Sequence, residues 1–214
     1  GAATATRPFI PPRDASASIS GILFSSGTTG TPKAIPWSHT TPLRCGVDAW
    51  ASLDVRPGDA LAWPTSLGWM MGPFLVWGAL LNGAAAVLFE GAPTGRGFCE
   101  CVQAARVTCL GTVPSLVRAW RAGGAAAGLD WGSVRAFGST GEASAPDDCL
   151  WLAARARYAP VLELCGGTEL AGGYAAGNLV QPWAPATFAG PALGSDFVLL
   201  AEGGGEGAGG AGGG

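Results

Sequence analysis

Short apolar segments alternate along the chain with segments typical of helices. The apolar segments are bounded by glycine, proline or serine, as is typical of buried strands. The predicted strands span residues 19–24, 60–63, 84–89, 107–110, 134–137 and 161–164. The predicted helices span residues 42–53, 69–81, 98–105, 115–121 and 144–158. Ser144 is the expected N-cap of the last helix and Pro146 its first-turn proline.

Alternation of strands and helices predicts an α/β fold, with a mostly parallel sheet flanked by helices. Ligands bind such sheets at the carboxyl ends of the strands, where the connecting loops gather. Three loops of unusual composition follow predicted strands, at residues 25–33, 139–142 and 165–169. We therefore expect these loops to face one crevice.

The composition is that of a domain with a sizeable core. The chain has 214 residues, of which 48% are hydrophobic and 13% charged, and its net charge is -3. Its charges are scattered, which argues against binding of nucleic acid or of an anionic membrane surface. The longest apolar stretch, residues 67–89, contains Pro73 and Asn82 and is not expected to span a membrane.

The two ends differ from the middle of the chain. Residues 1–14 form an N-terminal edge without the pattern of a signal peptide, and residues 15–200 form the folded part. The glycine-rich segment 201–214 lacks apolar side chains to offset its backbone entropy, so it is expected to be a disordered tail.

Six cysteines invite a disulfide or zinc interpretation, but the spacing supports neither. Only Cys99 and Cys101 are close in sequence, and the chain has one histidine. Most of the cysteines lie in apolar segments, where cysteine behaves as a small hydrophobic residue. We expect reduced, mostly buried thiols in an intracellular compartment.

The segment Ser-Ser-Gly-Thr-Thr-Gly-Thr-Pro-Lys has the composition of a phosphate-binding loop. Glycines allow the backbone to approach an anion, hydroxyls donate to it, and a lysine neutralises it. A surface turn is the alternative, but a turn does not require so many donors directly after a strand. The segment is not a Walker A loop, because Pro32 precedes Lys33 and Ala34 follows it. The candidate phosphate ligands are Ser25, Ser26, Gly27, Thr28, Thr29, Gly30 and Lys33.

This loop resembles the signature of the adenylate-forming superfamily, which includes acyl-CoA synthetases, peptide-synthetase adenylation domains and luciferases. A second segment, Cys-Gly-Gly-Thr-Glu at 165–169, is similar to the family motif in which threonine contacts phosphate and glutamate binds Mg²⁺. The resemblance thus gives Lys33, Thr168 and Glu169 catalytic roles, with Glu169 as the magnesium ligand. Cys165 departs from the family, which usually has an aromatic residue there against adenine. The resemblance still places Cys165 and Gly166 at the nucleotide.

A third segment resembles the part of the family that contacts adenine. It contributes Ser139, Thr140, Gly141 and Glu142, with Ala143 in place of the family's proline. Taken alone, this segment is equally well explained as a tight turn before the following helix.

A fourth segment, residues 65–72, is similar to the part of acetyl-CoA synthetase that lines the acyl pocket. Its residues alone favour the start of a core helix, but the resemblance places Trp69, Met70 and Met71 beside the acyl group. Acetyl-CoA synthetases have a tryptophan where this chain has Gly166. The glycine predicts a longer pocket and an acid larger than acetate.

The resemblance covers residues 15–200 and implies part of the large N-terminal domain of an adenylate-forming enzyme. It looks most like the plant peroxisomal acyl-activating enzymes related to acetyl-CoA synthetase. The implied reaction joins a carboxylic acid to ATP and passes the acyl group to coenzyme A, in the peroxisome or the cytoplasm. The family's ribose-binding aspartate, hinge and lid lysine are expected beyond residue 200, so this segment alone is expected to be inactive. An adenylation domain that loads a carrier-protein thiol, or a truncated non-catalytic remnant, remains an alternative.

Overall fold

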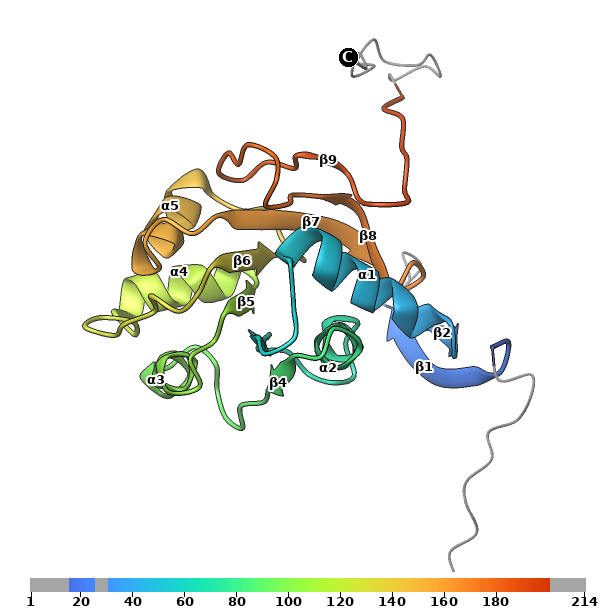
Figure 1. The fold of residues 1–214 in the computed structure, drawn as a ribbon, viewed down its shortest axis with the longest axis horizontal. Coiled ribbons are helices and arrows are strands. Elements are labelled where there is room, and N and C mark those ends of the chain that lie inside the picture. Colours follow the sequence, from blue (N-terminus) through green and yellow to red (C-terminus); the bar gives the residue numbers. More distant parts are fainter. Residues whose placement is uncertain (1–15, 26–30, 201–214) are drawn as a thin grey trace, which may run out of the picture.

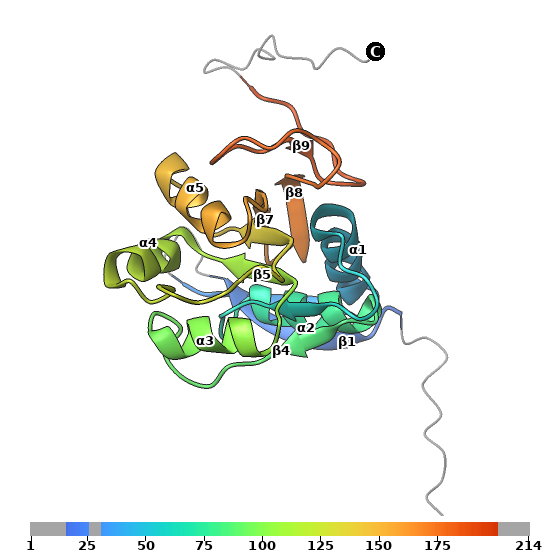
Figure 2. The same ribbon diagram turned by 60° about the vertical axis from the view of Figure 1, so that its left-hand side comes forward.

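Seven strands form one mixed sheet at the centre of the molecule. The computed structural model describes residues 16–25 and 31–200, and the tail expected at 201–214 lies outside them. The strand order is β4-β3-β5-β6-β7-β8-β9, and Figure 2 labels β4, β5, β7, β8 and β9 of this order from bottom to top. The first five strands run parallel, and β8 and β9 are antiparallel to their neighbours. Their bounds are β3 Ala60–Ala62, β4 Ala85–Val87, β5 Cys109–Thr112, β6 Ala136–Ser139, β7 Val161–Gly167, β8 Gly172–Ala176 and β9 Gly190–Pro191.

Helices cover both faces of this sheet, so the molecule has three layers (Figure 1). One face packs against α1 and α2, and the other against α3, α4 and α5. The cause is the alternation of side chains along each strand. Leu61 faces α1 and α2, for example, while its neighbour Ala62 faces the other three helices. The helices span Thr41–Leu53 (α1), Met71–Leu81 (α2), Arg96–Ala104 (α3), Pro114–Gly123 (α4) and Pro146–Arg155 (α5).

The predicted α/β class, with a mostly parallel sheet flanked by helices, is confirmed, and every predicted helix is present. Proline stands in the first turn of α1, α4 and α5, where its missing N–H leaves no helical bond unmade. The expected N-cap of α5 was wrong. Ala145 occupies that position, and the hydroxyl of Ser144 instead lies 3.0 Å from that of Ser139.

The first predicted strand differs from expectation. β1, Ile19–Ser25, pairs with β2, Lys33–Ser38, in a separate antiparallel hairpin. Ile19, Ile22 and Phe24 are 62%, 54% and 65% exposed, so the prediction of a buried strand was wrong. A short apolar segment between turn signals does not distinguish a buried strand from a hairpin strand. The sequence also gave no sign of β8, whose glycines and alanines carry little hydrophobic alternation.

The cysteines behave as small core residues. All six are free; four are buried, and Cys101 and Cys165 are half-buried. Burial raises the pKa of Cys45 to about 12 and that of Cys99 and Cys109 to about 11, so these thiols stay protonated at neutral pH. Within the described part of the chain, no helix has the length and apolar character needed to cross a bilayer.

Candidate functional site

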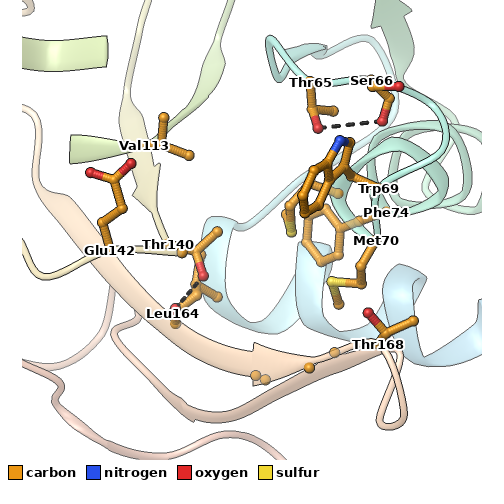
Figure 3. Close-up of a pocket in the computed structure, with 16 residues that line it drawn as sticks. Thr65, Ser66, Trp69, Met70, Phe74, Val113, Thr140, Glu142, Leu164 and Thr168 are labelled. Atoms are coloured by element: carbon orange, nitrogen blue, oxygen red, sulfur yellow. Dashed lines mark hydrogen bonds between the residues drawn. The ribbon is translucent and has the colours of Figure 1, made fainter. Parts of the chain in front are cut away.

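A pocket of about 520 Å³ opens where the loops that follow β3, β5, β6 and β7 come together. The carboxyl ends of parallel strands are the expected place for a ligand in this class of fold. Figure 3 shows two walls facing each other across the space, with Trp69, Met70 and Phe74 on one side and Thr140, Glu142 and Leu164 on the other. The pocket therefore unites segments that lie far apart in the sequence.

The apolar wall comes from the start of α2 and the loop before it. Trp69, Met70, Met71 and Phe74 all line the pocket, as do Thr65 and Ser66 at its rim. Trp69 is 69% exposed, so its ring stands at the open side rather than in the core. Flexible methionines and an aromatic ring suit an aliphatic ligand of variable shape. The predicted acyl-pocket residues Trp69, Met70 and Met71 are thus brought to one wall.

The polar wall is the loop after β6. Thr140 Oγ1 donates to the backbone oxygen of Leu164 at 2.6 Å, which fastens this loop to β7. The carboxylate of Glu142 turns to the start of α4, where it accepts from Ser115 Oγ at 2.6 Å and Ser115 N at 3.0 Å. Arg118 adds an ion pair at 3.2 Å. The hydrogen bond from Ser115 lowers the pKa of Glu142, so this carboxylate is ionised in the pocket wall.

Ser139 lies beneath this loop rather than in the pocket. Its side chain is 2% exposed and contacts the hydroxyl of Ser144. Glu163, on the neighbouring strand β7, is 5% exposed, and Cys149 Sγ lies 3.7 Å from its Oε1. Burial raises the pKa of Glu163, against hydrogen bonds from Ser144 and Ser139. A buried polar cluster therefore supports the loop after β6 from below, and no motif in the sequence indicated this cluster.

The floor of the pocket is formed by the end of β7 and the start of β8. Gly166, Gly167 and Thr168 line it together with Gly172 and Gly173. A Cβ at Gly166 would overlap the carbonyl oxygen of Gly172, so the close pairing of β7 and β8 requires glycine there. The predicted residues Gly166 and Thr168 are therefore brought to the same pocket as Thr140, Gly141 and Glu142.

Glu169 follows β7 and faces the hairpin. Its Oε1 lies 3.5 Å from Ser25 Oγ, and Ser25 is paired with Lys33 across the base of β1 and β2. The hairpin thus brings both ends of the predicted phosphate loop to the Thr168–Glu169 segment. Neither Ser25 nor Lys33 lines the pocket itself. The residues between them that were predicted to bind phosphate, 26–30, lie outside the described residues.

The donor set around Glu169 fits Mg²⁺ only together with a phosphate. Among the described residues, no group of three histidine, cysteine or acidic side chains is placed to hold a metal. Glu169 contributes one exposed carboxylate, with the Ser25 hydroxyl beside it. Mg²⁺ commonly takes one or two carboxylates, with phosphate oxygens and water completing its shell. One carboxylate beside a phosphate loop is consistent with that pattern.

Cys165 does not line the pocket. Its Sγ lies 2.9 Å from the hydroxyl of Tyr174 on β8, and the Tyr174 ring meets Phe197 edge-on at 6.3 Å between centroids. An aromatic surface therefore stands next to the position where the resembling family has an aromatic residue, but it comes from the adjacent strand.

Two sets of residues that the sequence analysis missed hold the floor in place. Trp37 Nε1 donates to the backbone oxygen of Thr168 at 2.9 Å. Asp48, 1% exposed on α1, accepts from Gly173 N at 2.7 Å and pairs with Arg44 at 2.9 Å. Arg44 in turn donates to Gly173 O at 2.6 Å. An arginine four residues before an aspartate on one helix was the only available signal.

Comparison with known proteins identifies the family of the chain. The family model described as AMP-binding enzyme matches residues 2–213. Over 183 residues the chain is 51% identical to hexanoyl-CoA synthase of Cannabis sativa, covering 86% of this chain and 25% of that protein. Over 181 residues it is 53% identical to probable acyl-activating enzyme 17, peroxisomal, of Arabidopsis thaliana, covering 85% of this chain and 25% of that protein.

The solved structures agree as well. The acetoacetyl-CoA synthetase from Streptomyces lividans superimposes with a TM-score of 0.76 and 31% sequence identity, over 86% of this chain and 30% of that one. The chain spans about a quarter of the length of the two curated relatives, because each match covers 25% of the relative.

Proposed function

Because this chain belongs to the AMP-binding enzyme family, we propose that the protein uses ATP to activate a carboxylic acid longer than acetate, and then transfers the acyl group to coenzyme A. The observation that carries the proposal is the pocket of about 520 Å³ with an apolar wall opposite a polar one. Activation of an acid needs both kinds of surface, one for the hydrocarbon chain and one for the nucleotide.

The physical obstacle in this reaction is the attack of a carboxylate on a triphosphate, both of them anions. The hydroxyls and backbone N–H groups of residues 25–30 would hold the phosphates, with Lys33 at the base of the hairpin neutralising charge. Thr168 would add a hydroxyl from the pocket floor. Together these donors lower the barrier by fixing the triphosphate in line for attack, because a preorganised donor needs no rearrangement when charge moves.

Glu169 would hold Mg²⁺ against the phosphates, and the ion would supply charge neutralisation there. Glu169 lies beside Ser25, at the point where the phosphate loop begins. The side chain is exposed, so a nucleotide has access to it.

The adenine subsite would lie between the loop after β6 and the end of β7. Thr140, Gly141 and Glu142 provide polar groups at the pocket wall, and Ser139 supports them from below. Cys165 offers little surface for stacking. Tyr174, whose hydroxyl lies 2.9 Å from the thiol, would supply an aromatic ring in its place.

The acyl chain would lie against Trp69, Met70, Met71 and Phe74, above the floor to which Gly166 belongs. These four side chains offer more apolar surface than a two-carbon acid would cover. We propose coenzyme A as the acceptor of the acyl group because one relative, at 51% identity, is a hexanoyl-CoA synthase. We propose the peroxisome as the compartment because another relative, at 53% identity, is described as peroxisomal.

The test is ATP–pyrophosphate exchange by the full-length protein that contains this chain, with straight-chain acids from acetate to dodecanoate. Lys33→Ala and Glu169→Gln are the informative variants, because each removes one charge from the phosphate site. We expect acid-dependent exchange that falls on the order of 10²–10³-fold in each variant. A well-folded protein without exchange for any acid would support the non-catalytic remnant instead.

A further inference from the structure

Trp63 is a buried residue beside the pocket that neither the sequence motifs nor the proposed reaction includes. It follows β3 directly and is 3% exposed. The register pairs Ala62 with Leu110, so Trp63 stands level with Gly111 on the neighbouring strand β5. Its indole lies on the face of the sheet that packs against α1 and α2.

Two glycines make the space that the indole occupies. Gly111 pairs with Gly138 on β6, so the two lie side by side across the sheet. A Cβ at Gly111 would overlap the indole, and a Cβ at Gly138 would lie 2.8 Å from its Cη2 atom. The ring therefore rests flat on the backbone of β5 and β6. Any side chain at either glycine would displace it.

The indole supports two residues that line the acyl side of the pocket. Phe74 meets it edge-on, with ring centroids 5.4 Å apart and an angle of 74°. Leu164 belongs to the same buried cluster as Trp63, and a Cβ at Gly138 would lie 2.8 Å from Trp63 Cη2 and 3.3 Å from Leu164 Cδ1. Phe74 and Leu164 both line the pocket and are labelled in Figure 3. Trp63 thus forms the layer directly behind the inner end of the pocket.

We propose that Trp63 determines the length of the acyl chain that the pocket accepts, acting through Phe74 and Leu164. This inference rests on the proposed function, because it assigns the pocket to an acyl group. A smaller side chain at position 63 would leave space above Gly111 and Gly138, and Phe74 would move back into it. The pocket would then deepen at the end where Phe74 lies.

The size of the side chain at position 63, rather than its hydrogen bonding, sets the depth of the pocket in this proposal. Trp63 Nε1 is buried and has no hydrogen-bond partner among the described residues. Trp63→Phe therefore removes part of the ring without breaking a bond, whereas Trp63→Leu removes more volume. Trp50→Leu, on α1, is the matched control because that tryptophan is 54% exposed and lies outside the pocket.

The experiment measures kcat/KM of the full-length protein for hexanoate and decanoate in the wild type and these three variants. The decanoate-to-hexanoate ratio should rise about tenfold in Trp63→Leu, less in Trp63→Phe, and not at all in Trp50→Leu. The KM for ATP should stay unchanged throughout. An unchanged acid ratio in folded Trp63→Leu and Trp63→Phe would overturn the inference while leaving the proposed function intact.

Binding without turnover gives the second measurement. If the wild type activates no acid, the proposed function fails, and calorimetric titration of the same variants with hexanoate and decanoate still tests the role of Trp63. Stronger relative binding of decanoate by Trp63→Leu supports the inference. Equal relative binding in the wild type and Trp63→Leu rejects it. If Trp63→Leu does not fold, the same comparison is made with Trp63→Phe.

Discussion

Ser25 Oγ lies 3.5 Å from Glu169 Oε1, although 144 positions separate the two residues in the chain. This contact joins the base of the hairpin to the end of β7. We expect Ser25→Ala to weaken ATP–pyrophosphate exchange about two- to tenfold, which corresponds to the loss of one hydrogen bond. Ser25→Asp should weaken it more, because a second carboxylate would repel the phosphates that Glu169 helps to hold.

Ser20→Ala is the control for this pair. Ser20 belongs to the same strand, but its hydroxyl contacts the backbone oxygens of Trp37 and Ser38. Exchange should therefore remain close to the wild-type rate. If Ser25→Asp exchanged as fast as Ser25→Ala, the hairpin base would not lie at the phosphates.

Trp37 positions the pocket floor through a hydrogen bond to the carbonyl oxygen of Thr168. Trp37→Phe keeps an aromatic ring but loses the donor. We expect the free energy of unfolding to fall by about 1–3 kcal/mol, and the KM for ATP to rise because Thr168 is no longer fixed. Chemical denaturation and exchange kinetics measure the two effects. Trp50→Phe, at an exposed position, should change neither.

Glu163 makes stability depend on pH. Burial raises its pKa above the ordinary value for glutamate, so the folded protein binds this proton more tightly than the unfolded chain does. The stabilisation is present below the ordinary pKa of 4.5 and is lost as the pH rises through the raised folded-state pKa. The melting temperature of the wild type should therefore fall across that window relative to Glu163→Gln.

The pKa of Glu142 is shifted in the opposite direction, so the pH dependence that Glu142 contributes to stability serves as the comparison. The hydrogen bond from Ser115 lowers the pKa of Glu142, so its contribution is present above the ordinary pKa of 4.5 and is lost as the pH falls through the lowered one. The effect should be small, because the side chain is 41% exposed. A Glu163→Gln variant with the pH profile of the wild type would show that Glu163 is not the titrating group.

The parallel core could be predicted from the sequence because its signals are local. Strands β3 to β7 are apolar segments between helices, and α1, α4 and α5 have proline in their first turns, so pattern alone locates these strands. The hairpin could not be predicted in this way. Whether β1 pairs with β2 or with the main sheet depends on residues outside 19–24, so this segment does not encode the choice by itself.

The site likewise has one part that could be predicted from the sequence and another that could not. Segments 25–33, 139–142 and 165–169 were expected in one crevice, and the pocket contains residues from the last two, which lie at the ends of β6 and β7. The supports of the site were not foreseen, because each depends on contacts between distant positions. Asp48 reaches Gly173 across 125 positions, and Trp63 lies over glycines of two other strands. An isolated aspartate or tryptophan in a sequence carries no such information.

Gly166 provides the last test of how the pocket is built. Because a Cβ there would overlap the carbonyl oxygen of Gly172, Gly166→Ala must push β8 away from β7. We expect a loss of about 1–3 kcal/mol in the free energy of unfolding, and a greater loss of exchange for decanoate than for acetate, because the added group enters the floor. Denaturation and exchange across the acid panel measure both.

Gly190→Ala on β9 is the matched control, since a Cβ there would meet nothing within 4 Å. It lies in the same sheet but outside the pocket, so stability and acid preference should both be preserved. If Gly166→Ala were as stable as Gly190→Ala, β8 would have room to move, and the narrow pairing with β7 would not define the floor. If stability fell but the acid preference stayed the same, Gly166 would support the sheet without bounding the acyl chain.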